Sequence, residues 1–314
     1  MIGFISRRIA QTIVVTLLLT FLTFLLFHSL PGGPARAILG RRASSAQLAA
    51  FTKANGLDKS VFVQFGDYLS RLLHGDLGFS YKQNQSVSAI LGEQIPKSLV
   101  LVSVSTVLAL VIGLSTGLFQ AIRRNSIADH ALTGTAFILY AMPDFFLGLI
   151  LIDIFAIRLH LFPTEGPQGS WTEAFTQPKG MVLPIATLTL TSIAIFSRYM
   201  RSSALDVFGQ DYIRVVRAKG ASGGRVLWSH TLRNAGIPIV TLLGLSLPGL
   251  FSGALITEEV FNYPGIGLET FVAAFNRDYP VELAITVIVG VTTLVGNLVA
   301  DLAYGLLDPR VRLR

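Results

Sequence analysis

The chain has 314 residues, of which 52% are hydrophobic and only 14% are charged, whereas soluble domains average about 25% charged residues. It has no cysteine, which excludes disulfides, thiolate metal sites and cysteine nucleophiles. The net charge of +7 is typical of the cytoplasmic loops of a membrane protein, so we expect membrane lipid and no nucleic acid among its partners.

Long apolar runs recur along the chain, and each can cross about 30 Å of hydrocarbon as a helix that rises about 1.5 Å per residue. Helices are favoured because backbone groups in lipid have to be hydrogen-bonded internally. The sequence therefore predicts an all-α integral membrane protein. Its six predicted transmembrane helices are Ile9–Leu30, Ser98–Gln120, His130–Phe155, Met181–Tyr199, Ile237–Thr257 and Val281–Leu302.

The first apolar run follows Arg7 and Arg8 and so has the charge pattern of a secretory signal peptide. The apolar part of such a signal has about 7–15 residues, however, and this run is longer. We interpret it as an uncleaved signal anchor that serves as the first span.

Residues 31–97, which we call the outer segment, are too structured to be a simple connector between spans. Ser44 or Ser45 is placed to cap a short helix that ends near Asn55-Gly56. A second helix is expected to stop at Gly75, because apolar residues recur before it at helical spacing: Val61, Phe62, Phe65, Tyr68, Leu69, Leu72 and Leu73. The outer segment is expected either to cap the helical bundle on the extracytoplasmic side or to bind a partner there.

Residues 205–235, which we call the basic hairpin, lie between the fourth and fifth spans. Lys219 followed by Gly220 is a typical helix end, and Ser222 is placed to cap a second helix. The first helix carries one apolar stripe formed by Leu205, Phe208, Tyr212, Val215 and Val216. Spacing alone fits two interpretations equally: a surface helix held by anionic lipid, or a docking element for a soluble partner.

Charge placement orients the chain in the membrane. The short loop before the last span is acidic and contains Arg277 as its single basic residue. Basic residues gather instead at the opposite ends of the spans: Arg7, Arg8, Arg123, Arg124, Arg198, Arg201, Arg214, Arg217, Lys219, Arg225, Arg233, Arg310, Arg312 and Arg314. The positive-inside rule therefore places both termini and the basic hairpin in the cytoplasm. The predicted parts are residues 1–30 with the first span, the outer segment 31–97, and a five-helix core 98–314 that includes the cytoplasmic loop 201–235.

Few ionisable residues lie at membrane depth. Asp144 follows Pro143 in the third predicted span, where a kink is expected, and a carboxylate in hydrocarbon costs about 2.5–3.5 kcal/mol. Asp144 should therefore face protein or water, in a translocation pathway or in a structural hydrogen bond. Gly249 and Gly253 form a small-residue face that favours tight packing, a subunit contact or a passage, and Ser246 lies in the same span. The candidate pathway residues are Asp144, Ser246, Gly249 and Gly253.

Motifs for catalysis and for nucleotide binding are absent from the sequence. There is no Gly-Lys dipeptide, so a Walker A loop for ATP cannot form, and neither H-E-x-x-H nor G-x-S-x-G occurs. The 5 histidines are scattered without a pair at ligand spacing. We therefore predict a protein that is not an enzyme, with no catalytic residues, no metal site and no cofactor of its own.

Several segments together resemble one known family. They are residues 57–65, 75–80 (Gly-Asp-Leu-Gly-Phe-Ser), 211–221 (Asp-Tyr-Ile-Arg-Val-Val-Arg-Ala-Lys-Gly-Ala), 230–238, 259–267 (Glu-Val-Phe-Asn-Tyr-Pro-Gly-Ile-Gly) and 308–312 (Asp-Pro-Arg-Val-Arg). The chain is similar over its whole length to permease subunits of binding-protein-dependent ABC importers, and most to the first (B-type) permease of dipeptide, oligopeptide and nickel systems. It departs from the usual pattern at Gly33, Val215, Val216 and Pro248.

The resemblance implies a type I ABC importer permease fold in a bacterial inner membrane. It implies that the basic hairpin carries a coupling helix that sits in a groove of an ATPase subunit, with the site residues Asp211, Tyr212, Arg214, Arg217, Ala218, Lys219, Gly220, Ala221, Arg233 and Asn234. The implied partners are a second homologous permease, two ATP-binding subunits that use ATP and Mg²⁺, and an extracytoplasmic substrate-binding protein. Peptides are the family's commonest cargo. The alternatives are a secondary transporter or channel that works without ATPases, and an intramembrane enzyme.

Overall fold

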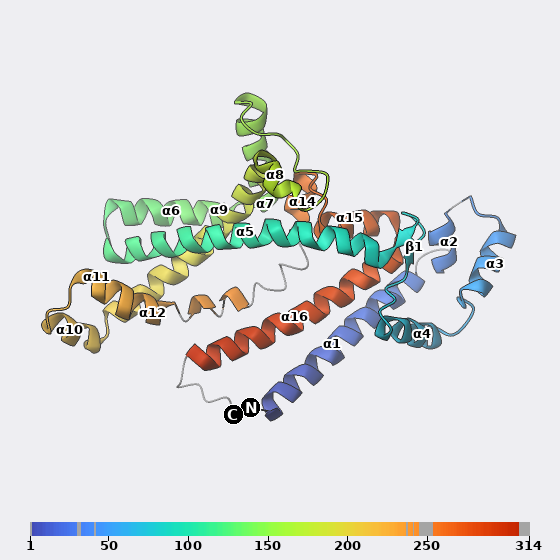
Figure 1. Ribbon diagram of the computed structural model, residues 1–314, viewed down its shortest axis with the longest axis horizontal. Coiled ribbons are helices and arrows are strands. Elements are labelled where there is room, and N and C mark those ends of the chain that lie inside the picture. The colour runs from blue at the N-terminus through green and yellow to red at the C-terminus, as the bar shows by residue number, and fades with distance from the viewer. Residues whose placement is uncertain are drawn as a thin grey trace.

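The computed structural model describes residues 2–29, 33–40, 42–236, 238–240, 242–244 and 254–307. Its framework is two pairs of long helices (Figure 1). One pair is α5 (Val87–Ile122) with α9 (Pro178–Phe208), and the other is α1 (Ile2–His28) with α16 (Tyr279–Leu307). The outer segment and the basic hairpin lie at opposite ends of the long axis, as expected if they are on opposite sides of a membrane.

Helices α5 and α9 run in parallel and approach closely because α5 presents two glycines one turn apart. A Cβ on Gly113 would lie 2.7 Å from the Cβ of Phe196, and a Cβ on Gly117 would lie 2.3 Å from the carbonyl oxygen of Ser197. Small residues at this spacing let helix backbones meet in lipid, where apolar burial alone gives no drive to associate. The sequence analysis did not single out this pair. The glycine face that it did single out, Gly249 and Gly253, lies outside the described residues.

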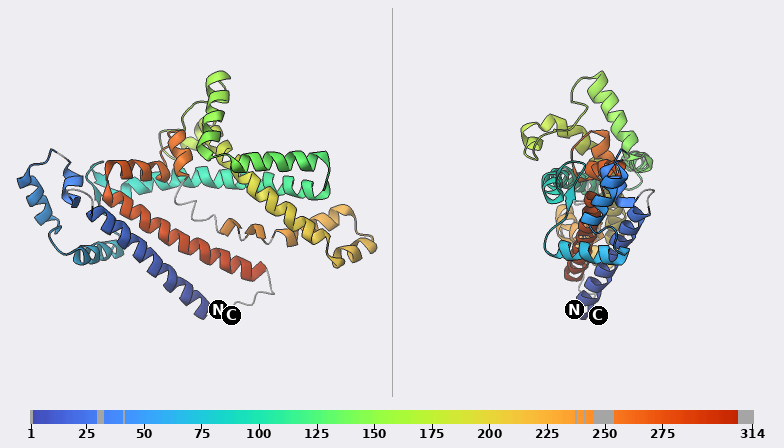
Figure 2. Two further views of the ribbon diagram at one scale, coloured as in Figure 1. Left: turned by 180° about the vertical axis from the view of Figure 1, so that it is seen from behind. Right: turned by 90° about the vertical axis from the view of Figure 1, so that its right-hand side faces the viewer.

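Helices α1 and α16 run antiparallel, so the start of α1 and the end of α16 lie at the same end of the pair (Figures 1 and 2). A Cβ on Gly290 would lie 2.6 Å from the Thr16 side chain, and the rings of Phe27 and Tyr279 stack 4.4 Å apart at the other end. This geometry is compatible with both termini on one side of a membrane.

Four described helices are long and apolar enough to cross a membrane, and a bent pair makes up to five spans. The bent pair is α6 (Ile127–Ala141) followed by α7 (Asp144–Leu151) and the π-helix η1 (Ile152–Arg158), with a bend of 106°. The segment predicted as one span over His130–Phe155 thus consists of two helices, and the predicted kink at Pro143 is confirmed. Met142 is extended, which is the conformation that a following proline imposes.

The fifth predicted span, Ile237–Thr257, falls mainly outside the described residues. The count of six transmembrane helices therefore stays a prediction.

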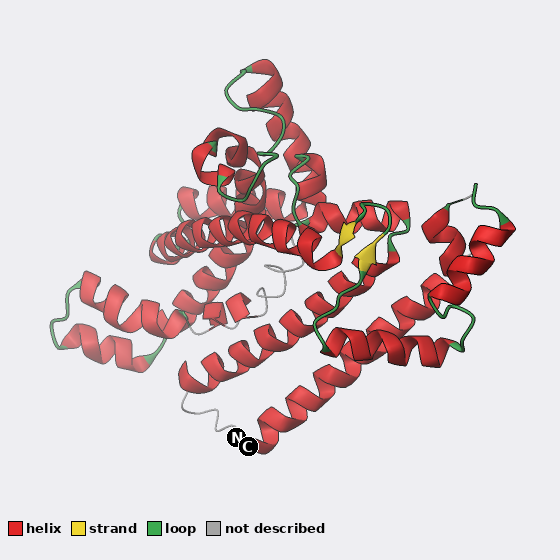
Figure 3. Cartoon of the chain, turned by 45° about the vertical axis from the view of Figure 1, so that its right-hand side comes forward, coloured by secondary structure: helices red, strands yellow, loops and turns green. Residues whose placement is uncertain are grey.

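The outer segment contains α2 (Gly33–Leu39), α3 (Ser45–Ala54), α4 (Val61–Leu73) and the antiparallel strands β1 (Phe79–Ser80) and β2 (Gln85–Ser86) (Figure 3). Ser44 caps α3 in a reciprocal capping box with Gln47. Gly56 and Gly75 follow α3 and α4 with positive φ, so both predicted helices and their stops are confirmed. His28 of α1 and Gln64 of α4 are hydrogen-bonded at 2.8 Å, which fastens the outer segment to the first span.

The remaining helices are short and lie near the ends of the long ones. At the outer end they are α8 (Glu173–Thr176), α14 (Leu255–Val260) and α15 (Ile266–Asn276), and at the opposite end α10 (Asp211–Ala218), α11 (Gly223–Arg225), the π-helix η2 (Val226–Thr231) and α12 (Leu232–Ala235). The loop before α8 packs on the turn between α14 and α15, because Gly166 donates a backbone hydrogen bond to the Phe261 carbonyl at 2.8 Å.

Candidate functional site

The basic hairpin begins with a break at the end of α9. Helix α9 ends at Phe208, Gln210 is extended, and α10 begins at Asp211. The single apolar stripe predicted from the sequence is therefore divided: Leu205 and Phe208 belong to α9, whereas Tyr212, Val215 and Val216 belong to α10. This break between the two helices turns the hairpin away from the axis of α9 (Figure 1).

The hairpin buries some apolar side chains and exposes others. In α10 the buried apolar side chain is that of Ile213, and in η2 it is that of Val226. By contrast, the exposed fractions are 40% for Tyr212, 52% for Val215 and 68% for Trp228. Apolar side chains that remain exposed beside a packed hairpin core are typical of a surface that another molecule covers.

The turn between the two halves of the hairpin depends on Gly220. Its φ is +81°, its N–H donates to the Arg217 carbonyl at 3.0 Å, and the Ala221 N–H donates to the Val216 carbonyl at 3.3 Å. These two bonds form a Schellman motif, the common helix end that has glycine in the left-handed position. No atom lies within 4 Å of a Cβ built on Gly220. Backbone conformation, and not crowding within this chain, therefore explains the glycine.

Polar contacts hold the second half of the hairpin against the first. Ser222 caps α11 as predicted, accepting a hydrogen bond from the Arg225 N–H. The Asn234 amide donates 2.8 Å hydrogen bonds to the Tyr212 hydroxyl and to the His230 carbonyl. The structure thus brings together two of the predicted site residues, Tyr212 and Asn234, that are far apart in the sequence.

The charged side chains of the hairpin point mainly to solvent. The Arg217 guanidinium lies 6.0 Å from the centre of the Phe208 ring, and Arg214 pairs with Asp211 at 3.3 Å with both side chains exposed. Exposed pairs of this kind contribute little to stability. The other members of the predicted site are exposed or partly exposed: Ala218, Lys219, Gly220, Ala221 and Arg233.

A charged pair joins the helices next to the hairpin. The Arg201 guanidinium of α9 donates two 2.8 Å hydrogen bonds to the Asp129 carboxylate of α6, whose side chain is 1% exposed. The Gln120 amide of α5 donates to Thr133 of α6 at 3.0 Å. The sequence analysis missed Asp129 and counted Arg201 only as a cytoplasmic charge, because nothing local relates two residues on different helices. This pair gives the hairpin a rigid base of α5, α6 and α9.

The candidate pathway is described in part. Asp144 is the first residue of α7, its side chain is exposed on this chain, and it makes no hydrogen bond or ion pair with any other described residue. Ser246, Gly249 and Gly253 lie outside the described residues. Asp153, nearer the outer end, pairs with Arg158 at 2.8 Å.

Glu258, which is fully buried, fastens α14 and α15 to the outer end of α5. Its Oε1 accepts from the Ser98 hydroxyl at 2.6 Å and the Ala254 N–H at 3.2 Å, and its Oε2 accepts from the N–H groups of Gly267 at 2.8 Å and Leu268 at 3.1 Å. The carboxylate thus satisfies free N–H groups at the start of α15, where a negative charge is also favoured by the helix dipole.

The two glycines of the Pro-Gly-Ile-Gly segment are explained by close contacts with α14, from the Glu258 carboxylate and from the Leu255 backbone. A Cβ on Gly265 would lie 2.4 Å from a Glu258 oxygen, and a Cβ on Gly267 would lie 2.5 Å from the Leu255 Cα. The sequence resemblance began at Glu259, which is exposed, and so missed its buried neighbour.

Two further buried carboxylates hold the β1–β2 turn at the outer end. The Gln83 amide donates to Glu269 at 2.5 Å, and the Ser80 hydroxyl donates to Asp278. Burial raises the pKa of Glu269, and the nearby Asp278 carboxylate adds to that rise. Burial likewise raises the pKa of Asp278 above its ordinary value.

The raised pKa values predict that the outer end is more stable at acidic pH. Between the ordinary and the raised pKa the folded state holds more protons than the unfolded state, so stability falls as pH rises through the raised pKa. We expect slower hydrogen exchange of residues 79–86 at pH 5 than at pH 8, after correction for intrinsic rates. Glu269→Gln keeps the acceptor for Gln83 and should reduce this pH dependence, whereas Asp58→Asn, at an exposed carboxylate, should not. An unchanged dependence in Glu269→Gln would contradict the prediction.

Comparison with known proteins covers the whole chain. The model of the family described as "Binding-protein-dependent transport system inner membrane component" matches residues 109–313, and the model of its N-terminal part matches residues 1–102. The chain is 39% identical over 314 residues to the oligopeptide transport system permease protein AppB of Bacillus subtilis, with 99% of each chain covered. It is 34% identical over 339 residues to the dipeptide transport system permease protein DppB of Escherichia coli, again with 99% of each covered.

A solved structure shares the fold. The methionine ABC transporter MetNI, in an inward-facing conformation, matches with a TM-score of 0.55 and 17% identity over 70% of this chain and 96% of that one. At this identity the match shows the fold alone, which is that of an ABC importer permease. The resemblance inferred from sequence motifs is thereby confirmed, and the chain belongs to the family of binding-protein-dependent transport system inner membrane components.

Proposed function

We propose that this chain is a permease subunit of an ATP-driven importer and forms half of a passage for peptides through a bacterial inner membrane. A second, homologous permease supplies the other half, and an extracytoplasmic binding protein delivers the peptide. Two ATPase subunits, which use ATP and Mg²⁺, dock on the basic hairpin. The chain itself is a transport component and not a catalyst. The cargo assignment is supported by relatives named as oligopeptide and dipeptide permeases.

The observation that carries the proposal is the construction of the basic hairpin. It exposes Tyr212, Val215 and Trp228 together with several basic side chains, while its own core is packed against α9. A short helix transmits a rigid-body motion only if it is held at both ends. The exposed face supplies one attachment, for an ATPase groove, and the packed base supplies the other.

The long helix α9 supports a mechanical link to the outer end. It is continuous from Pro178 to Phe208, and the Asp129–Arg201 pair ties its cytoplasmic end to α6. Movement of the hairpin by docked ATPases would therefore tilt α9 and the helices packed on it. Such tilting would shift the balance between inward-facing and outward-facing states, which is alternating access.

A reconstituted transport assay tests the function. Liposomes that contain this chain, its second permease and both ATPases, supplied with the binding protein and ATP, should accumulate labelled di- and oligopeptides. Liposomes that lack the ATPases, or that receive a non-hydrolysable ATP analogue, should not. Uptake by this chain alone would instead favour a secondary transporter or channel.

Orientation can be tested with single cysteines, because the chain has none of its own. With the hairpin in the cytoplasm, Trp228→Cys should react with a membrane-impermeant maleimide only after the inner membrane is permeabilised. Lys53→Cys, an exposed position on α3, should react in intact spheroplasts. Both side chains are exposed on this chain, and spheroplasts that lack the ATPase subunits are used so that docking does not cover position 228. Labelling of position 228 from outside would overturn the docking proposal.

A further inference from the structure

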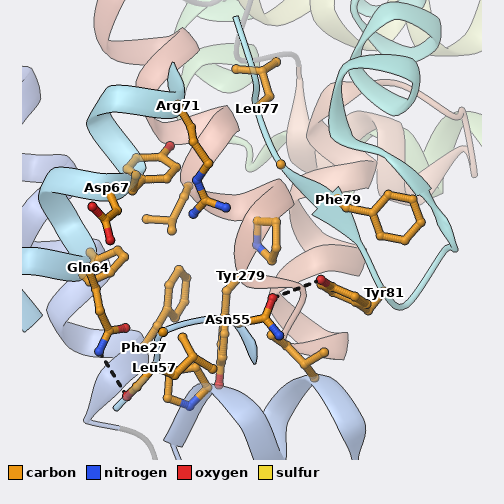
Figure 4. Close-up of a pocket in the computed structure, with 18 of the residues that line it drawn as sticks. Phe27, Asn55, Leu57, Gln64, Asp67, Arg71, Leu77, Phe79, Tyr81 and Tyr279 are labelled. Carbon is orange, nitrogen blue, oxygen red and sulfur yellow. Dashed lines mark hydrogen bonds between the residues drawn. The ribbon is translucent and has the colours of Figure 1, made fainter. Parts of the chain in front are cut away.

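A cavity of about 400 Å³ lies where the outer segment meets the outer ends of α1 and α16 (Figure 4). This outer cavity, as we call it, is within the range of small-molecule pockets, about 300–1,000 Å³. Three separate parts of the chain line it, and the residues that matter here are Phe24, Phe27, Tyr68, Arg71, Tyr279 and Leu283. It is distant from the basic hairpin and from α7 (Figure 1).

One wall of the outer cavity is apolar and aromatic. Phe24 and Leu283 are buried, and the Phe27 ring stacks on the Tyr279 ring at 4.4 Å. These residues belong to α1 and α16, on the last turns of one span and the first turns of the other. Aromatic side chains at the ends of spans are typical of the membrane–water interface.

Three polar groups at the cavity lack partners among the described residues. The hydroxyls of Tyr68 and Tyr279 are buried without a hydrogen bond, in side chains that are 7% and 5% exposed. A buried polar group that stays unpaired costs about 1–3 kcal/mol. Arg71 makes no ion pair with any described residue, and Figure 4 shows its guanidinium extending into the cavity.

Arg71 gives the outer cavity a site for an anionic group. Of the nearby carboxylates, Asp67 is paired with Lys59 at 2.9 Å, and Asp76 accepts the Gly78 N–H at 2.8 Å. Arg71 is then the charge left to meet a ligand. The chemistry therefore fits a phosphate-like group attached to an apolar body.

Helix α4 lies against lipid-facing surface beside the cavity. Its Phe62 is 76% exposed and stacks on Phe21 of α1 at 5.7 Å. Leu25 and Leu26 of α1 are exposed nearby along the same span. An amphipathic helix with exposed apolar side chains beside a span is typical of one that rests in the membrane interface. Lipid is thus the anionic amphiphile available at this level.

We propose that the outer cavity binds an anionic phospholipid of the outer leaflet. Arg71 holds the phosphate, and the first part of an acyl chain lies along Phe24, Phe27 and Leu283. Because α4, α1 and α16 all line the cavity, a bound lipid fastens the outer segment to two spans. This site is separate from the proposed transport function.

The test uses the full chain in a neutral detergent with fluorescent phosphatidylglycerol as the probe. We expect saturable binding that is tenfold or more weaker in Arg71→Gln, since a hydrogen bond to a charged group contributes about 1.5–3 kcal/mol. Arg42→Gln, at an exposed arginine of the outer segment outside the cavity, is the matched control and should bind as the original chain does.

Competitors separate the possible ligands. Unlabelled phosphatidylglycerol should displace the probe, while phosphatidylcholine, inorganic phosphate and a tripeptide should do so at least tenfold less well. Equal displacement by inorganic phosphate would overturn the lipid assignment in favour of a free anion. Displacement by the tripeptide would overturn it in favour of a substrate site. Unchanged binding in Arg71→Gln would remove the outer cavity as the site.

Discussion

Replacing Gly220 with arginine or aspartate should abolish ATP-dependent transport while the chain still inserts into the membrane. Gly220 has a φ of +81°, and a side chain in the left-handed region costs about 1–2 kcal/mol. The Schellman turn that sets the angle between α10 and α11 would then be lost or strained. The new side chain would also project from the exposed surface that we propose to meet the ATPase. Transport and ATPase co-purification should be measured on membranes with equal subunit content.

A graded series separates backbone conformation from collision with the partner. Asparagine tolerates the left-handed region, so Gly220→Asn should keep most of the transport activity that Gly220→Val loses. Gly224→Arg is the matched control for an added charge, because a Cβ there also meets no atom within 4 Å and φ is not positive. Near-normal uptake by Gly220→Arg would refute the role of this turn in coupling. Equal loss in the asparagine and valine variants would assign the defect to collision.

Glu258→Gln should destabilise the outer end of the protein by about 1–3 kcal/mol. Each carboxylate oxygen of Glu258 accepts two hydrogen bonds, from four different donors. In glutamine one of these oxygens becomes an NH₂ group, which faces two donors in either orientation. With the NH₂ on the Ser98 side, the Ser98 hydroxyl can turn to accept from it, so the Ala254 N–H is the donor that loses its acceptor, at about 1–3 kcal/mol. The expected result is a lower unfolding temperature and less mature protein in the membrane.

Glu259→Gln provides the matched control for Glu258→Gln. It makes the same chemical change one residue away, on a side chain that is exposed and not buried. Its unfolding temperature should be that of the original chain, because surface substitutions usually change stability by less than about 0.5 kcal/mol. Similar unfolding temperatures for the two variants would show that the buried carboxylate does not hold α15 to α5.

Much of this protein can be predicted from the sequence because its signals are local. Apolar runs of span length predict the long helices, and Ser44, Ser222, Gly75 and Gly220 mark the helix ends where the structure has them. A cap or a left-handed glycine depends on residues a few positions away, so it can be read without knowing the fold. The family, too, was recognisable from short motifs spread over the chain.

The local signals fail where a single residue redirects the chain. The predicted stripe from Leu205 to Val216 assumed one continuous helix, but the extended Gln210 divides it. Pro143 predicted a kink, yet nothing in the sequence indicates that the bend reaches 106°. The angle at a break is decided by the packing of the helices on either side of it.

Sequence by itself thus determined that the chain is helical, lies in a membrane and ends its hairpin helix at Gly220. Tertiary structure alone decided which residues meet across long separations: Arg201 with Asp129, 72 positions apart, and Glu258 with Ser98, 160 apart. It also decided that Gly113 and Gly117 are the close contact of α5 with α9. The physical reason is that periodicity and capping act within one helix, whereas a buried charge or a glycine contact exists only once two helices have been brought together.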